Sequence, residues 1–102
     1  FLHGEAVAWG MIAASMIAVA MRKTDAATAK RVISTTLAYA PLPKVSTRAR
    51  SVLKRLRADK KTLDGVVHFV LPTRLGRVEV VPDVPEKIVM RAVEELRYLS
   101  SA

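Results

Sequence analysis

A long apolar stretch near the start of the chain limits the possible folds more than any other feature. It runs over residues 6–21, broken only by Gly10 and Ser15, between Glu5 and the pair Arg22 and Lys23. A helix of this length spans about 24 Å, which is shorter than the roughly 30 Å hydrocarbon core of a bilayer. The stretch therefore predicts a buried helix from Glu5 to about Lys23. A helix that is apolar on all sides needs neighbours on all sides, and the chain is short, so we expect part of its cover to be missing.

Three further helices are indicated by the residue pattern. A second helix has Thr24 or Asp25 as its N-cap and ends at the turn in residues 41–43. A third starts at Ser46 or Thr47, and a last one follows Asp83, which occupies an N-cap position. The positions that recur with helical spacing are Ala29, Val32, Ile33, Thr36, Leu37 and Ala40 in the second helix, Ala49, Val52, Leu53 and Leu56 in the third, and Ile88, Val89, Ala92, Val93, Leu96 and Leu99 in the last.

From Gly65 the period of the pattern changes to two, which is typical of strands. Apolar residues over 66–71 are followed by the turn 72–76 and by a second run, Arg77 to Val81. This predicts a β-hairpin. His68 lies on the face of the hairpin opposite to that of Phe69, and we expect it to be a surface histidine. The fold class is therefore mainly α, with about four helices and one small β-hairpin. We expect a single helical domain over residues 1–102.

Composition excludes several classes of function. The chain has no cysteine, so disulfide scaffolds, thiolate zinc sites and cysteine nucleophiles are ruled out, and a reducing compartment is allowed. It begins with Phe1, and no basic flank precedes an apolar run with a cleavage site. We therefore expect a cytoplasmic protein without a secretory signal or membrane segment, cut from something longer.

Positive charge is concentrated in one part of the chain. The net charge is +8, and residues 44–61 hold eight of the 17 basic residues but one of the nine acidic ones. Arg50, Lys54, Arg57 and Lys61 lie three or four positions apart, which stacks them on one side of the third helix. This basic face fits either a solvated surface or a phosphate-bearing ligand. Nucleic acid is disfavoured because aromatic residues are only 5% of the chain and none interleaves with the basic residues.

Four segments occur in an order that resembles the C-terminal domain of 3-dehydroquinate synthase, within the sugar-phosphate cyclase superfamily. They are Leu2-His3-Gly4-Glu5-Ala6-Val7-Ala8, Gly10-Met11, Asp59-Lys60-Lys61 and Phe69-Val70-Leu71-Pro72-Thr73-Arg74-Leu75-Gly76. The resemblance covers nearly the whole chain. It implies a shikimate-pathway enzyme that converts 3-deoxy-arabino-heptulosonate 7-phosphate to 3-dehydroquinate with loss of phosphate, using NAD.

The resemblance also implies roles for individual residues. In the family a divalent metal, usually zinc, is held by one glutamate and two histidines, and His3 matches the second histidine. A neutral imidazole on the rigid support of a buried helix suits zinc. A family lysine that contacts the anionic substrate matches either Lys60 or Lys61. We expect the cluster Asp59-Lys60-Lys61 to follow the third helix, with Asp59 able to cap or orient the turn there. Glu5 has a possible general-acid role beside His3, but at a helix start it more simply complements the helix dipole.

The resemblance also shows what the chain does not carry. The NAD-binding domain, the metal-binding glutamate and the first metal-binding histidine should precede Phe1, and the sequence has no Gly-x-Gly-x-x-Gly motif to hold a dinucleotide. One histidine does not hold a catalytic zinc, so we expect this chain alone to bind neither zinc nor NAD tightly and to be inactive in that reaction. Two alternatives remain: a stand-alone helical protein that forms a homo-oligomer through its uncovered apolar surfaces, and a fragment recruited to a small-molecule, hydrolase-like activity that uses His3, His68 or the basic cluster.

Overall fold

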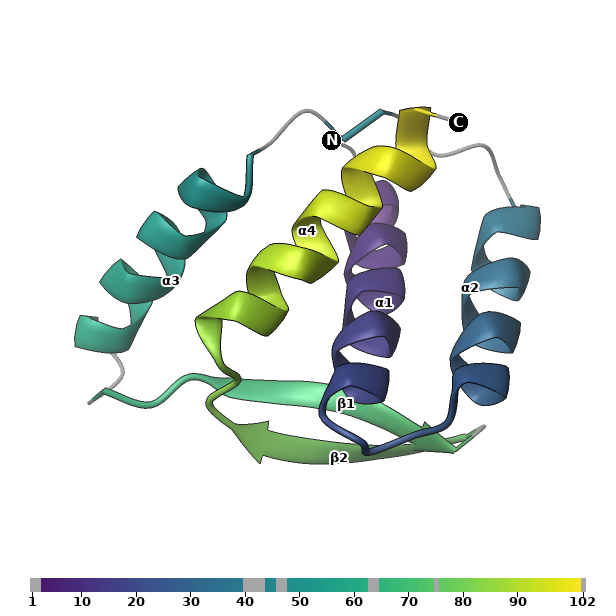
Figure 1. Ribbon diagram of the computed structural model, residues 1–102, viewed down its shortest axis with the longest axis horizontal. Coiled ribbons are helices and arrows are strands. Elements are labelled where there is room, and N and C mark those ends of the chain that lie inside the picture. The colour runs from purple at the N-terminus through teal and green to yellow at the C-terminus, as the bar shows by residue number, and fades with distance from the viewer. Residues whose placement is uncertain (1–2, 40–43, 46–47, 63–64, 75, 102) are drawn as a thin grey trace.

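The computed structural model describes residues 3–39, 44–45, 48–62, 65–74 and 76–101, without the side chains of residues 3–6, 39 and 101. Its elements are α1 (His3–Ala20), α2 (Ala26–Tyr39), α3 (Ala49–Thr62), β1 (His68–Arg74), β2 (Arg77–Pro82) and α4 (Glu86–Ser101). The mainly helical fold with one hairpin is thus confirmed. The helices stand side by side with the hairpin across one end, and α1 and α3 run toward the hairpin while α2 and α4 run away from it (Figure 1).

The hairpin closes one end of the core. β1 and β2 are antiparallel, with Phe69 opposite Val81 and Val70 opposite Val80. Leu71 and Val81 are buried, whereas His68 is exposed, so the prediction of a surface histidine is confirmed. Beneath the hairpin, one core cluster joins α1 to α3 and α4; its buried members are Ile17, Ala18, Leu53, Leu71, Val81, Val84, Val89 and Ala92. A second cluster at the other end of α1 contains Trp9, Ile12, Val45 and Leu96.

α1 is partly covered. Ile12 and Ala18 are fully buried, but Val7 and Met11 are 47% and 49% exposed, so the expectation that part of the cover is missing is confirmed. The helix begins at His3, two residues before the predicted Glu5, and ends at Ala20, before the predicted Lys23. Arg22 adopts a left-handed conformation (φ 58°), and the N–H groups of Arg22 and Lys23 donate to the carbonyls of Val19 and Ala18. This Schellman arrangement stops the helix without a glycine.

The other helix starts differ in how well they were predicted. Asp25 caps α2, because its Oδ1 accepts the N–H of Thr28 at 2.7 Å. The predicted N-cap role of Asp83 is wrong: its φ is 54°, and its N–H donates to the carbonyl of Val67, while Pro85 accepts the first N–H bonds of α4. At the start of α3, the carbonyl of Arg48 accepts the N–H groups of Ser51 and Val52. The predicted starting residues Ser46 and Thr47, and the turn 41–43, lie outside the described residues.

Candidate functional site

The cationic end of α3 holds both candidate substrate lysines. Lys60 and Lys61 lie in the last turn of the helix, so the prediction that they follow the helix is wrong. Asp59 is also helical, and its Oδ1 lies 3.4 Å from Nε of Arg55 one turn earlier, where it does not cap a turn. Two ammonium groups at this end interact favourably with the negative end of the helix dipole.

The two lysines have different surroundings. Nζ of Lys60 lies 3.3 Å from Oδ1 of Asp83, in the segment between β2 and α4. Lys61 is exposed. Asp83 also accepts the N–H of Val67 at 3.4 Å through Oδ1. Lys60 therefore belongs to a contact that ties α3 to the end of the hairpin where β1 begins and β2 ends. Of the two lysines, Lys61 is therefore the one whose ammonium group is available to an external anion.

A second ion pair connects α3 to the start of α4. Arg57 donates from Nε to Oε2 of Glu86 at 2.9 Å and from Nη2 to Oε1 at 2.7 Å. This two-point hydrogen bond lowers the pKa of the Glu86 carboxyl and raises the pKa of the Arg57 guanidinium. Arg57 is thus engaged within the molecule. The exposed basic side chains left on the predicted face are Arg50, Lys54 and Lys61.

His3 and the lysine pair lie at opposite ends of the molecule. His3 is the first residue of α1, at the end away from the hairpin, whereas the last turn of α3 lies at the hairpin end (Figure 1). An 18-residue helix such as α1 is about 27 Å long. The chain alone therefore does not bring His3 and Lys61 into one site. His68 begins β1, also at the hairpin end.

The described residues include no cluster of metal-binding side chains. Among them, no group of three or more histidine, aspartate or glutamate side chains is arranged to hold a metal ion. The side chains of His3 and Glu5 lie outside the description. A catalytic zinc site needs three protein ligands, so the described residues do not fit a metal centre by themselves.

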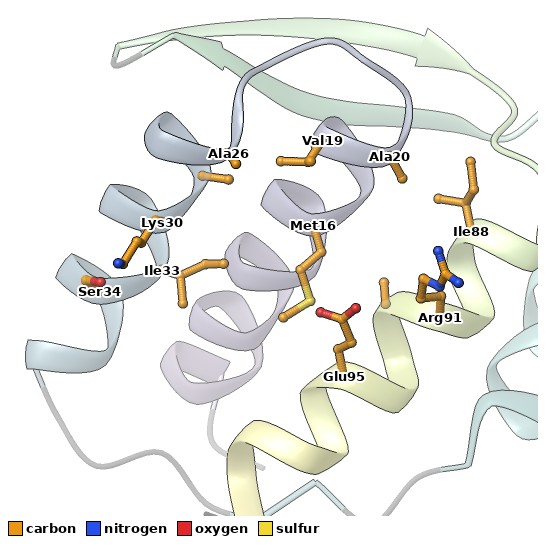
Figure 2. A pocket seen from close by; sticks show the side chains of 12 residues that line it. Met16, Val19, Ala20, Ala26, Lys30, Ile33, Ser34, Ile88, Arg91 and Glu95 are labelled. Carbon is orange, nitrogen blue, oxygen red and sulfur yellow. The ribbon is translucent and has the colours of Figure 1, made fainter.

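A groove on another side of the molecule was not anticipated from the sequence. It encloses about 410 Å³, with α1 as its floor and α2 and α4 as its walls (Figure 2). Met16 and Val19 supply the apolar floor, Lys30 stands on the α2 side, and Arg91 and Glu95 stand on the α4 side. None of the predicted site residues lines it. The sequence alone could not reveal this groove, because it forms only when α2 and α4 pack against α1.

The groove has the chemistry of a binding surface. Its twelve lining residues are Met16, Val19, Ala20, Ala26, Ala29, Lys30, Ile33, Ser34, Ile88, Arg91, Ala92 and Glu95. The set holds no histidine, so the Ser34 hydroxyl has no imidazole base within it for nucleophilic catalysis. An apolar floor with a few charged groups on its rim suits an apolar segment or ligand.

In the described part of the chain, no helix combines the length and apolarity needed to cross a bilayer. The described residues form a small, mainly helical fold with a cationic helix end. Residues 1–62 match the family described as 3-dehydroquinate synthase C-terminal, and the chain belongs to this family.

Curated relatives agree with that assignment. The chain is 58% identical over 100 residues to the 3-dehydroquinate synthase of Koribacter versatilis, covering 98% of this chain and 27% of the relative. It is 43% identical over 93 residues to that of Solibacter usitatus, covering 90% and 26%, and 37% identical over 97 residues to that of Crocosphaera subtropica, covering 93% and 27%. The chain thus spans about a quarter of the length of these relatives. No solved structure matches it.

Proposed function

We propose that this chain is the C-terminal part of a 3-dehydroquinate synthase, the enzyme that converts 3-deoxy-arabino-heptulosonate 7-phosphate to 3-dehydroquinate and phosphate with NAD and a divalent metal. The observation that carries the proposal is the 58% identity to the Koribacter versatilis synthase over 98% of this chain. The segments His3-Gly4-Glu5 and Asp59-Lys60-Lys61 both fall within the family match. Because the described residues form no metal cluster, the reaction requires the larger part of the enzyme.

His3 is assigned to the metal of the assembled enzyme. It begins α1, a helix anchored in the core by Trp9 and Ile12, and such a support holds a ligand in a fixed position. The other metal ligands and the NAD site are supplied by the missing N-terminal part. When bound, the metal acts as a Lewis acid toward substrate oxygens. The contribution of this chain is to fix one imidazole at a helix end.

Lys61 is assigned to the anionic substrate and Lys60 to a positioning role. The ion pair of Lys60 with Asp83 at 3.3 Å supports this division, as does the exposure of Lys61. An ammonium on a flexible stem suits a phosphate or carboxylate. Since His3 lies at the other end of this chain, Lys61 meets the substrate only if the rest of the enzyme brings the parts of the site together. We place the enzyme in the cytoplasm, a reducing compartment that is compatible with the lack of cysteine in this part of it.

The alternative is a self-associating helical protein derived from the same domain, recruited to a hydrolase-like activity on a small molecule. The groove of Figure 2 supports it, because its apolar floor offers a place for an apolar segment of a second copy or for a small ligand. A defined homo-oligomer, measured as molar mass by light scattering over a concentration series, and turnover by the isolated chain would support this alternative. A monomer without activity would remove it.

The proposed function can be tested in a joined enzyme, in which this chain replaces the matching segment of the Koribacter versatilis synthase. Phosphate release from 3-deoxy-arabino-heptulosonate 7-phosphate is measured with NAD and zinc. We expect turnover by the joined enzyme and none by the isolated chain. His3→Ala should lower kcat/KM more than roughly 100-fold, since residues that only support metal ligands already contribute about 10–100-fold.

Lysine variants of the joined enzyme refine this test. Lys61→Ala should lower kcat/KM about 10-fold or more, because a hydrogen bond to a charged group contributes about 1.5–3 kcal/mol. Lys54→Ala is the matched control, since Lys54 is also an exposed cation of α3, and it should retain activity. Full activity of both His3→Ala and Lys61→Ala would refute the assigned roles, and an inactive joined enzyme that is folded would refute the function.

A further inference from the structure

Exposed apolar side chains gather where α1, α2 and the hairpin meet. Val7 and Met11 of α1 are 47% and 49% exposed, and Val70 and Val78 of the hairpin are 57% and 62% exposed. A groove of about 360 Å³ runs between them. We call this surface the valine face; the residues that line it are Val7, Gly10, Met11, Ala14, Val32, Val70, Pro72 and Val78. No ionisable side chain lies in this set.

The hairpin carries apolar residues on both of its sides. Phe69, Leu71 and Val81 face the core, while Val70, Pro72 and Val78 lie on the other side, in the valine face. Val70 pairs with Val80, which is 57% exposed, and Pro72 pairs with Val78. A hairpin with one side in water normally alternates apolar and polar residues, and strands apolar on both sides are covered on both sides. The outer side of this hairpin therefore has the composition of a buried surface.

α1 has the same property on the same side. It is apolar around its whole circumference, and Val7, Gly10 and Met11 lie on the part that α2, α4 and the hairpin leave open. Two elements far apart in the chain thus present uncovered apolar surface to one place. Contiguous apolar patches of this kind mark interfaces in soluble proteins.

We propose that the valine face is the surface on which the upstream part of the same polypeptide packs, an inference that rests on the proposed function. The relatives are almost four times as long as this chain, which spans 27% of the Koribacter versatilis synthase. The face includes the N-terminal half of α1, next to the point where upstream chain would join. Its lining has no charged group, and interfaces of this composition belong to permanent assemblies.

A second copy of this chain fits the valine face less well. The chain carries a net charge of +8, which opposes association of two copies. The exposed residues Arg74 and Arg77 are opposite each other in the strand register, next to Pro72 and Val78. The rim of the face is therefore itself cationic. The groove of Figure 2 differs, since Lys30, Arg91 and Glu95 line it.

Cysteine labelling tests the proposal, because the chain has no cysteine of its own. Val78→Cys and Met11→Cys place one thiol on each of the two elements of the valine face, and the matched control Met90→Cys places one on α4, where Met90 is 39% exposed. Rates of reaction with a maleimide are measured in the isolated chain and in the joined enzyme described above. We expect both face thiols to react roughly tenfold or more slowly in the joined enzyme, since interface cores exclude water, with Met90→Cys unchanged.

The other outcomes separate the fate of this proposal from that of the proposed function. Face thiols that stay reactive in an active joined enzyme would refute it while leaving the proposed function intact. Protection that appears in the isolated chain as its concentration rises would identify a second copy as the occupant. Protected thiols in a folded but inactive joined enzyme would support the docking surface and refute the function. Two reporters on separate elements keep the test decisive if one substitution prevents folding.

Discussion

The Glu86 carboxylate accepts two hydrogen bonds from Arg57, of 2.9 and 2.7 Å. The pKa of Glu86 is lowered in the folded chain, first by these hydrogen bonds and further by the positive charges of Arg57 and Lys60. A carboxyl with a lowered pKa stabilises the fold above its unfolded pKa of about 4.3, and that contribution is lost as the pH falls through the lowered value. We predict that Glu86→Gln lowers the urea midpoint at pH 7 and has little effect near pH 2.

Asp25 provides the comparison for this experiment. The N–H of Thr28 lowers the pKa of its carboxyl, so Asp25→Asn, which keeps an acceptor oxygen, should reduce the acid sensitivity with a smaller loss at pH 7. If Glu86→Gln shows the same loss at both pH values, the ion pair is not the source of the pH dependence. Asp25 is exposed and the Glu86 side chain is 40% exposed, so their effects on the unfolding free energy should be modest.

At the scale of the element, Gly10 interrupts a helix that would be more stable without it. A Cβ built on Gly10 meets nothing within 4 Å, and glycine in a helix interior costs about 0.5–1 kcal/mol relative to alanine. Gly10→Ala should therefore raise the unfolding free energy of the isolated chain by about that amount in urea denaturation. The matched control is Gly65→Ala, which has equally open space but a φ of +84° and should lower stability by roughly 1–2 kcal/mol. A loss in Gly10→Ala would contradict the assignment of an open helix face.

Sequence patterns predicted which elements form but not how some of them end. Apolar spacing was sufficient for four helices and the hairpin, since each element buries one set of residues. Lys60 and Lys61 were expected to follow α3, yet the helix continues to Thr62, and the N–H of Gly65 donates to the carbonyl of Lys60 at 2.7 Å. Asp83 resembled an N-cap, but its backbone is fixed by Val67 across the hairpin, a contact that local sequence does not reveal.

At the scale of the whole molecule, the candidate site was the least predictable part. Motifs placed His3 and the lysine pair in one enzyme. In the structure α1 and α3 both run toward the hairpin (Figure 1), so His3 at the start of α1 and the lysines at the end of α3 lie at opposite ends of the molecule. The ion pairs of Arg57 with Glu86 and Lys60 with Asp83 likewise depend on tertiary packing. Their effect is to fix the hairpin and α4 against the cationic end of α3, which leaves Lys61 exposed there.

Uneven charge leads to a last prediction about the molecule as a whole. The net charge is +8, and Arg50 and Lys54 add to it as exposed neighbours on α3. Raising the salt concentration from about 0.01 M to about 1 M shortens the Debye length from about 30 Å to about 3 Å. Repulsion among the excess cations is then screened, so we expect the melting temperature of the isolated chain to rise with sodium chloride. The double variant Arg50→Gln and Lys54→Gln should melt higher than the unchanged chain at low salt and respond less to added salt. A melting temperature that falls with salt would mean that the ion pairs of α3 with α4 and the hairpin outweigh the repulsion, because screening weakens those pairs as well.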